Sequence, residues 1–182
     1  DELEKIKKDV KKMIRDNEDL LRRVEERVRE LNRRNEELLK EIEKRVEELI
    51  KRLEDVARRG EPEEVITTLE KEVRRLIKEV AERDEESLRE NRKLIKEIEE
   101  RDRESLRRAE KLIREVEKEV KDKREVLEAI RRLEKEARDV SRRSTRKIEE
   151  LLETSETSSE KSKRRIEELL RRLERVVEEA RK

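Results

Sequence analysis

The chain has 182 residues, of which 60% are charged, and its 55 basic and 54 acidic side chains leave a formal net charge of +1. Cys, His and aromatic residues are absent, which excludes disulfides, zinc sites and catalysis by a thiol or an imidazole. Charges of both signs are intermixed and apolar runs are short, so we expect no nucleic-acid-binding arm, membrane span or targeting signal. These features predict a soluble protein that needs no cofactor.

The remaining residues with reactive side chains are mostly carboxylates. Asp and Glu are candidate ligands for hard metals, but most of them stand beside Lys or Arg, which favours solvated ion pairs. No nucleophile–base pair or phosphate-binding loop is present, so the sequence predicts no catalytic, cofactor-binding or metal-binding residue and no enzyme. High charge also suits disorder, but the regular spacing of the apolar residues favours long helices.

The first helix is predicted at residues 1–59. It ends in the sequence ARRGEPEE, where Gly60 suits the position after a helix and Pro62 suits the first position of a new one. The second helix is therefore predicted at 62–120, and the first turn is well marked.

The second turn contains neither Gly nor Pro. In EVKDKREVLEA, Asp122 and Glu125 have the spacing of a capping box before an apolar-periodic run, which predicts the third helix at 123–182. Without a turn at Asp122, the second and third segments would form one rod of about 180 Å whose apolar stripe would pair with other chains. The stripe shifts its phase by about 70° across residues 120–126, which favours the turn.

An 18-residue repeat runs through all three segments, most plainly where RDEESLRENRKLIKEIEE at 83–100 is followed by RDRESLRRAEKLIREVEK at 101–118. Eighteen residues make about five whole α-helical turns, so the apolar face keeps its direction, whereas a heptad face drifts. This face covers about 120° of the first helix, enough to pack against two neighbours. The predicted fold class is all-α: a long, nearly straight, antiparallel up-down-up three-helix bundle. We expect it to be coiled-coil-like, about 90 Å long, and a single domain over residues 1–182.

Polar residues interrupt the apolar face at matching positions of the three segments. With turns at 60–61 and 121–122, residue m of the second helix lies level with residue 121 − m of the first, and residue k of the third with k − 122. In this register the polar residues form two layers. The first layer contains Asn17, Asp102, Ser105, Ser141 and Ser144, and the second contains Asn35, Asp84, Ser87, Ser159 and Ser162. The third repeat is apolar in the same columns, with Leu53, Ile66, Leu69, Val177 and Ala180.

A further polar set occurs only in the middle repeat and comprises Asn32, Asn91, Ser155 and Ser158. The segment LLETSETSSEKSKRR at 151–165 thus places its serines on the core face, and Thr154 and Thr157 toward solvent. A cross-helix hydrogen-bond network explains why three helices change together, since buried polar groups are tolerated when they are satisfied. Two local alternatives stay open: Ser bonding to its own i−4 carbonyl, and Asn at the seam of a coiled coil.

The partners of the two aspartates are left open by the sequence. Asp84 and Asp102 lie toward the edge of the core face, where they accept hydrogen bonds from Ser hydroxyls or reach water. The adjacent Arg83 and Arg101 are alternative partners, and spacing alone does not decide between these options.

The chain resembles de novo designed helical bundles with modular buried hydrogen-bond networks. The resemblance covers the whole chain and rests on the ideal repeat, the RRGEPEE loop, the Glu-, Lys- and Arg-rich surface, the lack of aromatic residues and the layered Asn and Ser. It implies a synthetic scaffold without a natural substrate, made in the cytoplasm of an expression host. The second turn departs from that style because it lacks Gly.

The predicted function is that of a non-catalytic structural scaffold whose polar core layers set helix register and pairing specificity. Misregistered packing would bury unpaired Asn or Ser, which costs about 1–3 kcal/mol for each unpaired group. Such a scaffold requires no partner. The alternative is a self-assembling or partner-binding helical module, a homo- or hetero-oligomer that switches at the 121–123 hinge. Lipid-surface binding is disfavoured by the balanced charge and the lack of aromatic anchors.

Overall fold

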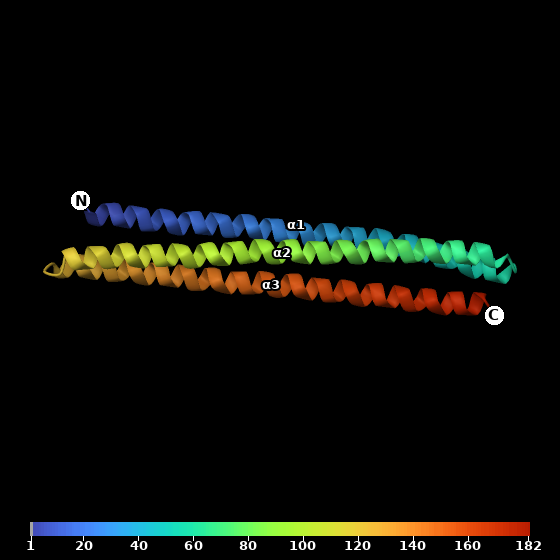
Figure 1. The fold of residues 1–182 in the computed structure, drawn as a ribbon. Coiled ribbons are helices and arrows are strands. Elements are labelled where there is room, and N and C mark those ends of the chain that lie inside the picture. The colour runs from blue at the N-terminus through green and yellow to red at the C-terminus, as the bar shows by residue number, and fades with distance from the viewer. Residues whose placement is uncertain (1) are drawn as a thin grey trace. The chain divides into compact units, whose positions relative to one another are not determined.

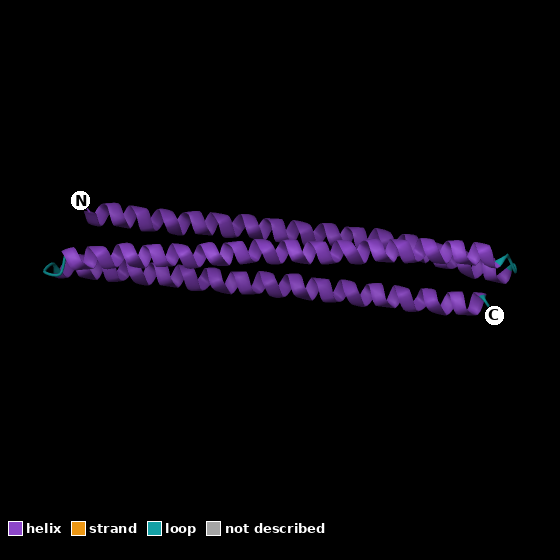
Figure 2. Cartoon of the chain, in the orientation of Figure 1, coloured by secondary structure: helices purple, strands orange, loops and turns teal. Residues whose placement is uncertain are grey.

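The computed structural model describes residues 2–182 and contains three α-helices in this range. They are α1 (Glu2–Arg58), α2 (Glu63–Glu119) and α3 (Arg124–Ala180), each 57 residues long. Figure 2 shows short turns between the helices and no strand among the described residues. The predicted all-α three-helix fold is confirmed, and the other helix ends lie within two residues of the predicted ones, while the predicted start at residue 1 lies outside the described residues.

The turn between α1 and α2 depends on the backbone conformation of Gly60. Its φ of 66° lies in the left-handed region, which Gly enters without the steric cost that a side chain would add. The Gly60 amide donates to the carbonyl of Ala57 (3.3 Å), and the Glu61 amide donates to that of Val56 (3.2 Å). This pair of bonds is the Schellman arrangement that closes a helix C-terminus. Pro62 lies directly before α2 rather than at its first position, one residue from the prediction.

The turn between α2 and α3 forms without Gly, and the chain reverses at Asp122 as predicted. The Lys123 amide donates to the carbonyl of Val120 (3.0 Å), and the Lys123 carbonyl accepts from the amide of Leu127 (3.1 Å). Lys123 is therefore the N-cap residue, because its carbonyl accepts the first i→i+4 bond of α3. The predicted capping box is thus wrong by one residue, since Glu125 occupies the second helical position rather than the third.

The three helices contribute to two compact units. Unit 1 contains the residues up to Val28 together with Asn91–Glu153, and unit 2 contains Arg29–Glu90 and Thr154–Lys182. In each unit, one segment of α1 packs with one of α2 and one of α3, and α2 runs antiparallel to the other two (Figure 1). Each unit is a short three-helix bundle, and a single domain over residues 1–182 stays a prediction.

Unit 2 is held together by one continuous hydrophobic cluster. Its buried residues recur at three- and four-residue intervals, so each helix segment turns one apolar stripe inward. Leu49, Leu53, Val73 and Leu173 are 0% exposed. The buried members are Leu39, Ile42, Val46, Leu49, Ile50, Leu53, Ile66, Leu69, Val73, Ile77, Val80, Ile166, Leu169, Leu173 and Val177.

The core of unit 1 is divided into three smaller clusters. Along each helix, the residues of the first polar layer stand between two of these clusters. One cluster contains Leu21, Val24, Val28, Ile95, Ile98, Ile148 and Leu151; the next contains Val10, Ala109, Leu133 and Ala137; the last contains Ile113, Val116 and Ile130. The polar layer therefore interrupts the apolar contacts of unit 1.

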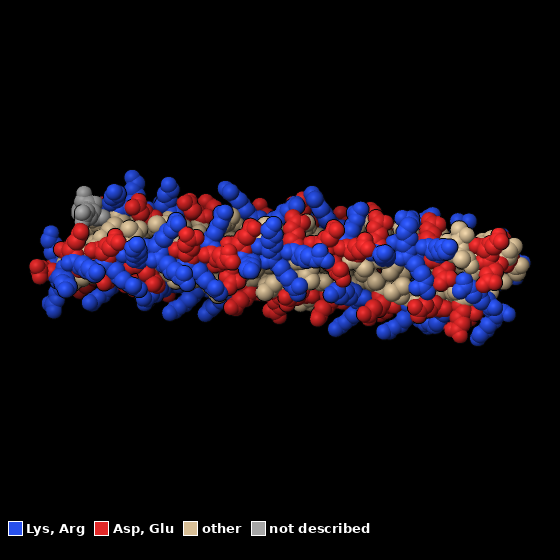
Figure 3. Space-filling view, viewed as in Figure 1, with Lys and Arg blue, Asp and Glu red and all other residues tan. Residues whose placement is uncertain are grey.

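Charged residues of both signs cover the surface, and Figure 3 shows them intermingled over the visible face. Many form i,i+4 pairs within one helix, such as Glu30 with Arg34 (2.6 Å) and Glu104 with Arg108 (2.8 Å). Such exposed pairs add about 0.3–0.5 kcal/mol each. Among the described residues, no large hydrophobic side chain is exposed, and no helix carries an apolar stretch long enough to cross a membrane.

Candidate functional site: the buried polar layers

The first polar layer lies in unit 1, where a hydrogen bond joins α2 to α3. Ser141 Oγ donates to Asp102 Oδ2 at 3.1 Å. Asp102 is 7% exposed and Ser144 is 5% exposed, while Asn17, Ser105 and Ser141 are partly buried. The register deduced from the sequence places Ser141 and Asp102 at the same level, so this contact agrees with it.

The second polar layer repeats this contact in unit 2. Ser159 Oγ donates to Asp84 Oδ2 at 2.9 Å. Asp84, Ser87, Ser159 and Ser162 are 8%, 7%, 5% and 6% exposed, and Asn35 is partly buried. The Oγ atom of Ser87 is buried without a hydrogen-bond partner. Two equivalent Ser–Asp bonds are thus observed, whereas the role of the wider set as one network stays a prediction.

Burial raises the pKa of Asp84 and of Asp102 above the ordinary value of 3.8. The main cause in each case is desolvation of the carboxylate, which disfavours its charged form. Ser159, Ser162 and Lys163 act in the opposite direction on the pKa of Asp84, whereas a single Ser donor opposes desolvation at Asp102. The two layers therefore hold equivalent carboxylates in different electrostatic surroundings.

The additional polar set of the middle repeat is also placed on the core face. Asn91 is 1% exposed and Ser155 is 2% exposed, while Asn32 and Ser158 are partly buried. Asn91 belongs to unit 1 and the other three belong to unit 2, so their common layer stays a prediction. The two Thr residues of the Ser-rich segment are exposed, as predicted.

For two of the serines, the observed bonds distinguish between alternatives that the sequence left open. Ser141 and Ser159 donate across helices and not to their own i−4 carbonyls. Two exposed Thr residues, by contrast, do donate to the carbonyl four residues earlier. Asp84 accepts a hydrogen bond from Ser159, and the adjacent Arg83 approaches Glu79 at 3.5 Å within α2.

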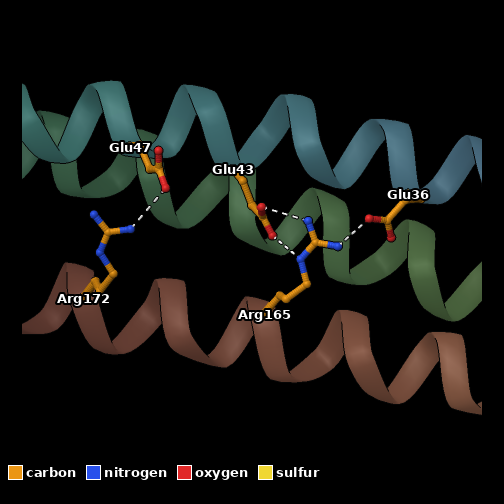
Figure 4. Close-up of polar contacts among 5 residues, drawn as sticks. All are labelled: Glu36, Glu43, Glu47, Arg165 and Arg172. Atoms are coloured by element: carbon orange, nitrogen blue, oxygen red, sulfur yellow. Dashed lines mark hydrogen bonds and ion pairs between the residues drawn. The ribbon is translucent and has the colours of Figure 1, made fainter.

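A cross-helix ion-pair cluster in unit 2 was not predicted from the sequence. Arg165 binds Glu43 through Nε to Oε1 at 2.6 Å and Nη2 to Oε2 at 2.9 Å, and its Nη1 donates to Glu36 Oε1 at 2.7 Å (Figure 4). The hydrogen bonds to Glu43 are the main reason why the pKa of Arg165 is raised above its ordinary range. Arg172 approaches Glu47 at 3.4 Å between the same helices. The register deduced from the sequence could have predicted this cluster, since it places Arg165 level with Glu43.

Shallow grooves between α1 and α2 adjoin both polar layers. Asn17 and Ser105 line the groove of unit 1, and Asn35 and Ser87 line that of unit 2. Every residue that lines the unit 1 groove has a counterpart, one 18-residue repeat away, in the unit 2 groove. Within the described part of the chain, no group of three or more Asp or Glu side chains is placed to hold a metal ion.

These features define the chain as an antiparallel three-helix bundle with repeated Ser–Asp bonds in its core. A solved structure described as "Computationally designed three helix bundle" has the same fold, with 21% identity, a TM-score of 0.60, and coverage of 98% of this chain and 88% of that chain. At this identity the similarity shows the fold alone, and for the fold it confirms the resemblance to designed bundles. No protein-family model and no curated protein matches the chain.

Proposed function

We propose that this chain is a non-catalytic structural scaffold of the designed type, in which polar core layers set helix register and pairing specificity over a single domain. The observation that carries the proposal is the same hydrogen bond at two places one repeat apart, Ser141 to Asp102 and Ser159 to Asp84. The scaffold requires no cofactor and no partner to complete its core.

A buried hydrogen bond adds about 1 kcal/mol, whereas a buried polar group left without its partner costs about 1–3 kcal/mol. If α3 slipped along α2 by one helical turn so that Ala137 took the place of Ser141, Asp102 would lose its Ser donor. The apolar stripes would still meet after such a slip, because they recur at every turn. The polar layers therefore penalise a register that apolar packing alone would tolerate.

A distance measurement between α2 and α3 tests this proposal. The chain contains no Cys, so spin labels at Glu110→Cys and Arg138→Cys report one distance without background. These two residues approach each other at 3.5 Å between Arg138 Nε and Glu110 Oε1. We expect one narrow distance distribution in the parent chain and several distances after all polar-layer residues are replaced by their third-repeat counterparts. One narrow distribution in both proteins would show that the layers do not set register.

A second candidate function is a partner-binding or self-assembling module. The observation in its favour is the repeated groove, which in unit 2 is lined by Ser87 with its buried, unbonded Oγ. Small-angle X-ray scattering at several concentrations separates the two functions. A concentration-independent mass of 22.4 kDa supports the isolated scaffold, whereas a multiple of that mass supports assembly.

A further inference from the structure

A small cavity lies in unit 1 beside the first polar layer. It offers about 20 Å³ of room for the centre of a water molecule. Its wall combines the polar residues Asn17, Asp102, Ser105 and Ser141 with apolar side chains that include Ala109. The cavity is thus lined by polar and by apolar side chains.

Two small residues account for the cavity. Ala109 and Ala137 both line it. In the third repeat, the same two columns hold Val73 and Leu173, which are 0% exposed and fill the corresponding space. The middle repeat has Asn and Ser in these columns. The first repeat is therefore the one that has Ala in both columns.

We propose that this cavity binds one water molecule that donates to Asp102 and is held by Asn17 and Ser105. A water needs roughly 10–15 Å³ of such room and two to four polar partners, and the cavity meets both requirements. A carboxylate accepts about four hydrogen bonds, and Asp102 receives one from Ser141, so accepting positions remain for a water donor. Purely apolar cavities stay dry, but this one is lined by a carboxylate, an amide and two hydroxyls.

The water has a route from the surface. Met13, Asn17 and Ser105 line both the cavity and the shallow groove between α1 and α2 of unit 1. Asn17 and Ser105 are themselves only partly buried, so the polar layer is reachable through this groove. The bound water should exchange with solvent without unfolding of the unit.

The test is a pair of measurements on the full chain. In the NMR spectrum of the parent protein, water–amide cross-relaxation at the amides of Asp102 and Ser141 should have the sign that is expected for a long-lived bound water. A high-resolution crystal structure should show one ordered oxygen at about 2.7–3.0 Å from the Asp102 carboxylate. In Ala109→Val, whose new methyl groups enter the cavity, both signals should be lost. The pKa of Asp102 should then rise further, while that of Asp84 stays unchanged.

Val73→Ala provides the matched control, because it opens space in the same column among apolar neighbours. We expect no bound water there. The proposal is overturned if the parent protein shows neither the NMR signal nor the ordered oxygen, or if both persist in Ala109→Val. Density at about 2.3–2.6 Å from several oxygens would also overturn it, since that distance indicates a cation. The two measurements on the parent protein test for the bound water even if the variants fail to fold.

Discussion

Unit 2 packs Val73 and Leu173 at 0% exposure in the columns where unit 1 has Ala109 and Ala137. The first pair belongs to one continuous hydrophobic cluster, and the second belongs to one of three separate clusters. Both units follow the same pattern of inward-facing positions. The comparison therefore separates two contributions to a core: the pattern decides which faces meet, and side-chain volume decides how well they fill the space between them.

The columns that form the ion pair between α1 and α3 in unit 2 hold a different basic residue in unit 1. In unit 2, the guanidinium of Arg165 forms a fork with Glu43. In unit 1, the equivalent columns hold Lys147 and Glu25, which line a groove between α1 and α3. Lys is a compact point charge and cannot make the two parallel bonds of Arg. The fork between α3 and α1 is thus observed in unit 2, where the basic residue of this column is Arg.

Truncation of matched core positions should damage unit 2 more than unit 1. Leu49 is 0% exposed, whereas Met13, in the same column of the first repeat, is partly buried. We expect Leu49→Ala to lower the free energy of unfolding by about 3–5 kcal/mol and Met13→Ala by about 1–2 kcal/mol, because less area and packing are lost at a half-exposed site. Denaturation in guanidinium chloride measures both values, and equal losses would contradict the comparison.

Exchange of the second polar layer for the apolar third-repeat residues should stabilise unit 2. The variant combines Asn35→Leu, Asp84→Ile, Ser87→Leu, Ser159→Val and Ser162→Ala. Asp84 has to be included, since removal of its Ser donors alone would leave a buried carboxylate unpaired. We expect a gain of about 1–4 kcal/mol, a rise of roughly 2–15 °C in thermal midpoint. A lower midpoint at unchanged oligomeric state would argue against the layer being a core position.

Removal of one Ser donor should lower the free energy of unfolding more in unit 1 than in unit 2, which is the reverse of the order expected for core truncation. Asp102 has a single Ser donor, so Ser141→Ala should cost about 1–3 kcal/mol. Ser159→Ala should cost about 0.5–1.5 kcal/mol, because Ser162 and Lys163 still favour the charged form of Asp84. Thr157→Ala, an exposed change on the same helix, is the control and should stay within about 0.5 kcal/mol. A larger loss for Ser159→Ala than for Ser141→Ala would refute this order.

Because of the two buried aspartates, the free energy of unfolding should fall as the pH rises. Burial raises the pKa of Asp84 and Asp102 in the folded protein above 3.8, so the folded state holds these protons more tightly than the unfolded chain does. Their contribution to stability is fully present below pH 3.8 and is lost as the pH rises through the raised values. Denaturation between about pH 3 and pH 7 of the parent and of Asp102→Asn isolates the effect. A difference between the two proteins that grows in favour of the parent with rising pH would contradict it.

The smallest effect is expected from exchange of the two basic residues. Arg165→Lys should lower the free energy of unfolding by about 0.5–1 kcal/mol through loss of the fork to Glu43. Lys147→Arg should raise it by up to about 0.5 kcal/mol, because Glu18 and Glu25 stand where Glu36 and Glu43 stand in unit 2. Both effects should shrink in high salt, since these side chains are partly exposed. Salt-independent effects would point to packing instead.

The fold was predictable because the helical period and the turn chemistry are local properties. An 18-residue repeat keeps the same face inward over any length of helix, and Gly60 closes α1 in a conformation that Gly adopts readily. Equal segment lengths then set the levels of the residues across helices, and the bonds Ser141–Asp102 and Ser159–Asp84 follow that register. The N-cap at Lys123 was one residue off because several neighbouring residues can start a helix when no Gly or Pro marks the turn.

The sequence by itself determined which residues face inward, where the chain turns and that Ser141 and Ser159 lie level with Asp102 and Asp84, because backbone geometry fixes the rise and rotation of each residue in a helix. Only the tertiary structure decided that Ser87 Oγ lacks a partner, that Arg165 takes two glutamates, and that Ala109 leaves room beside Asp102. Those features depend on the volumes and rotamers of side chains from different helices, which meet only when the helices are packed together.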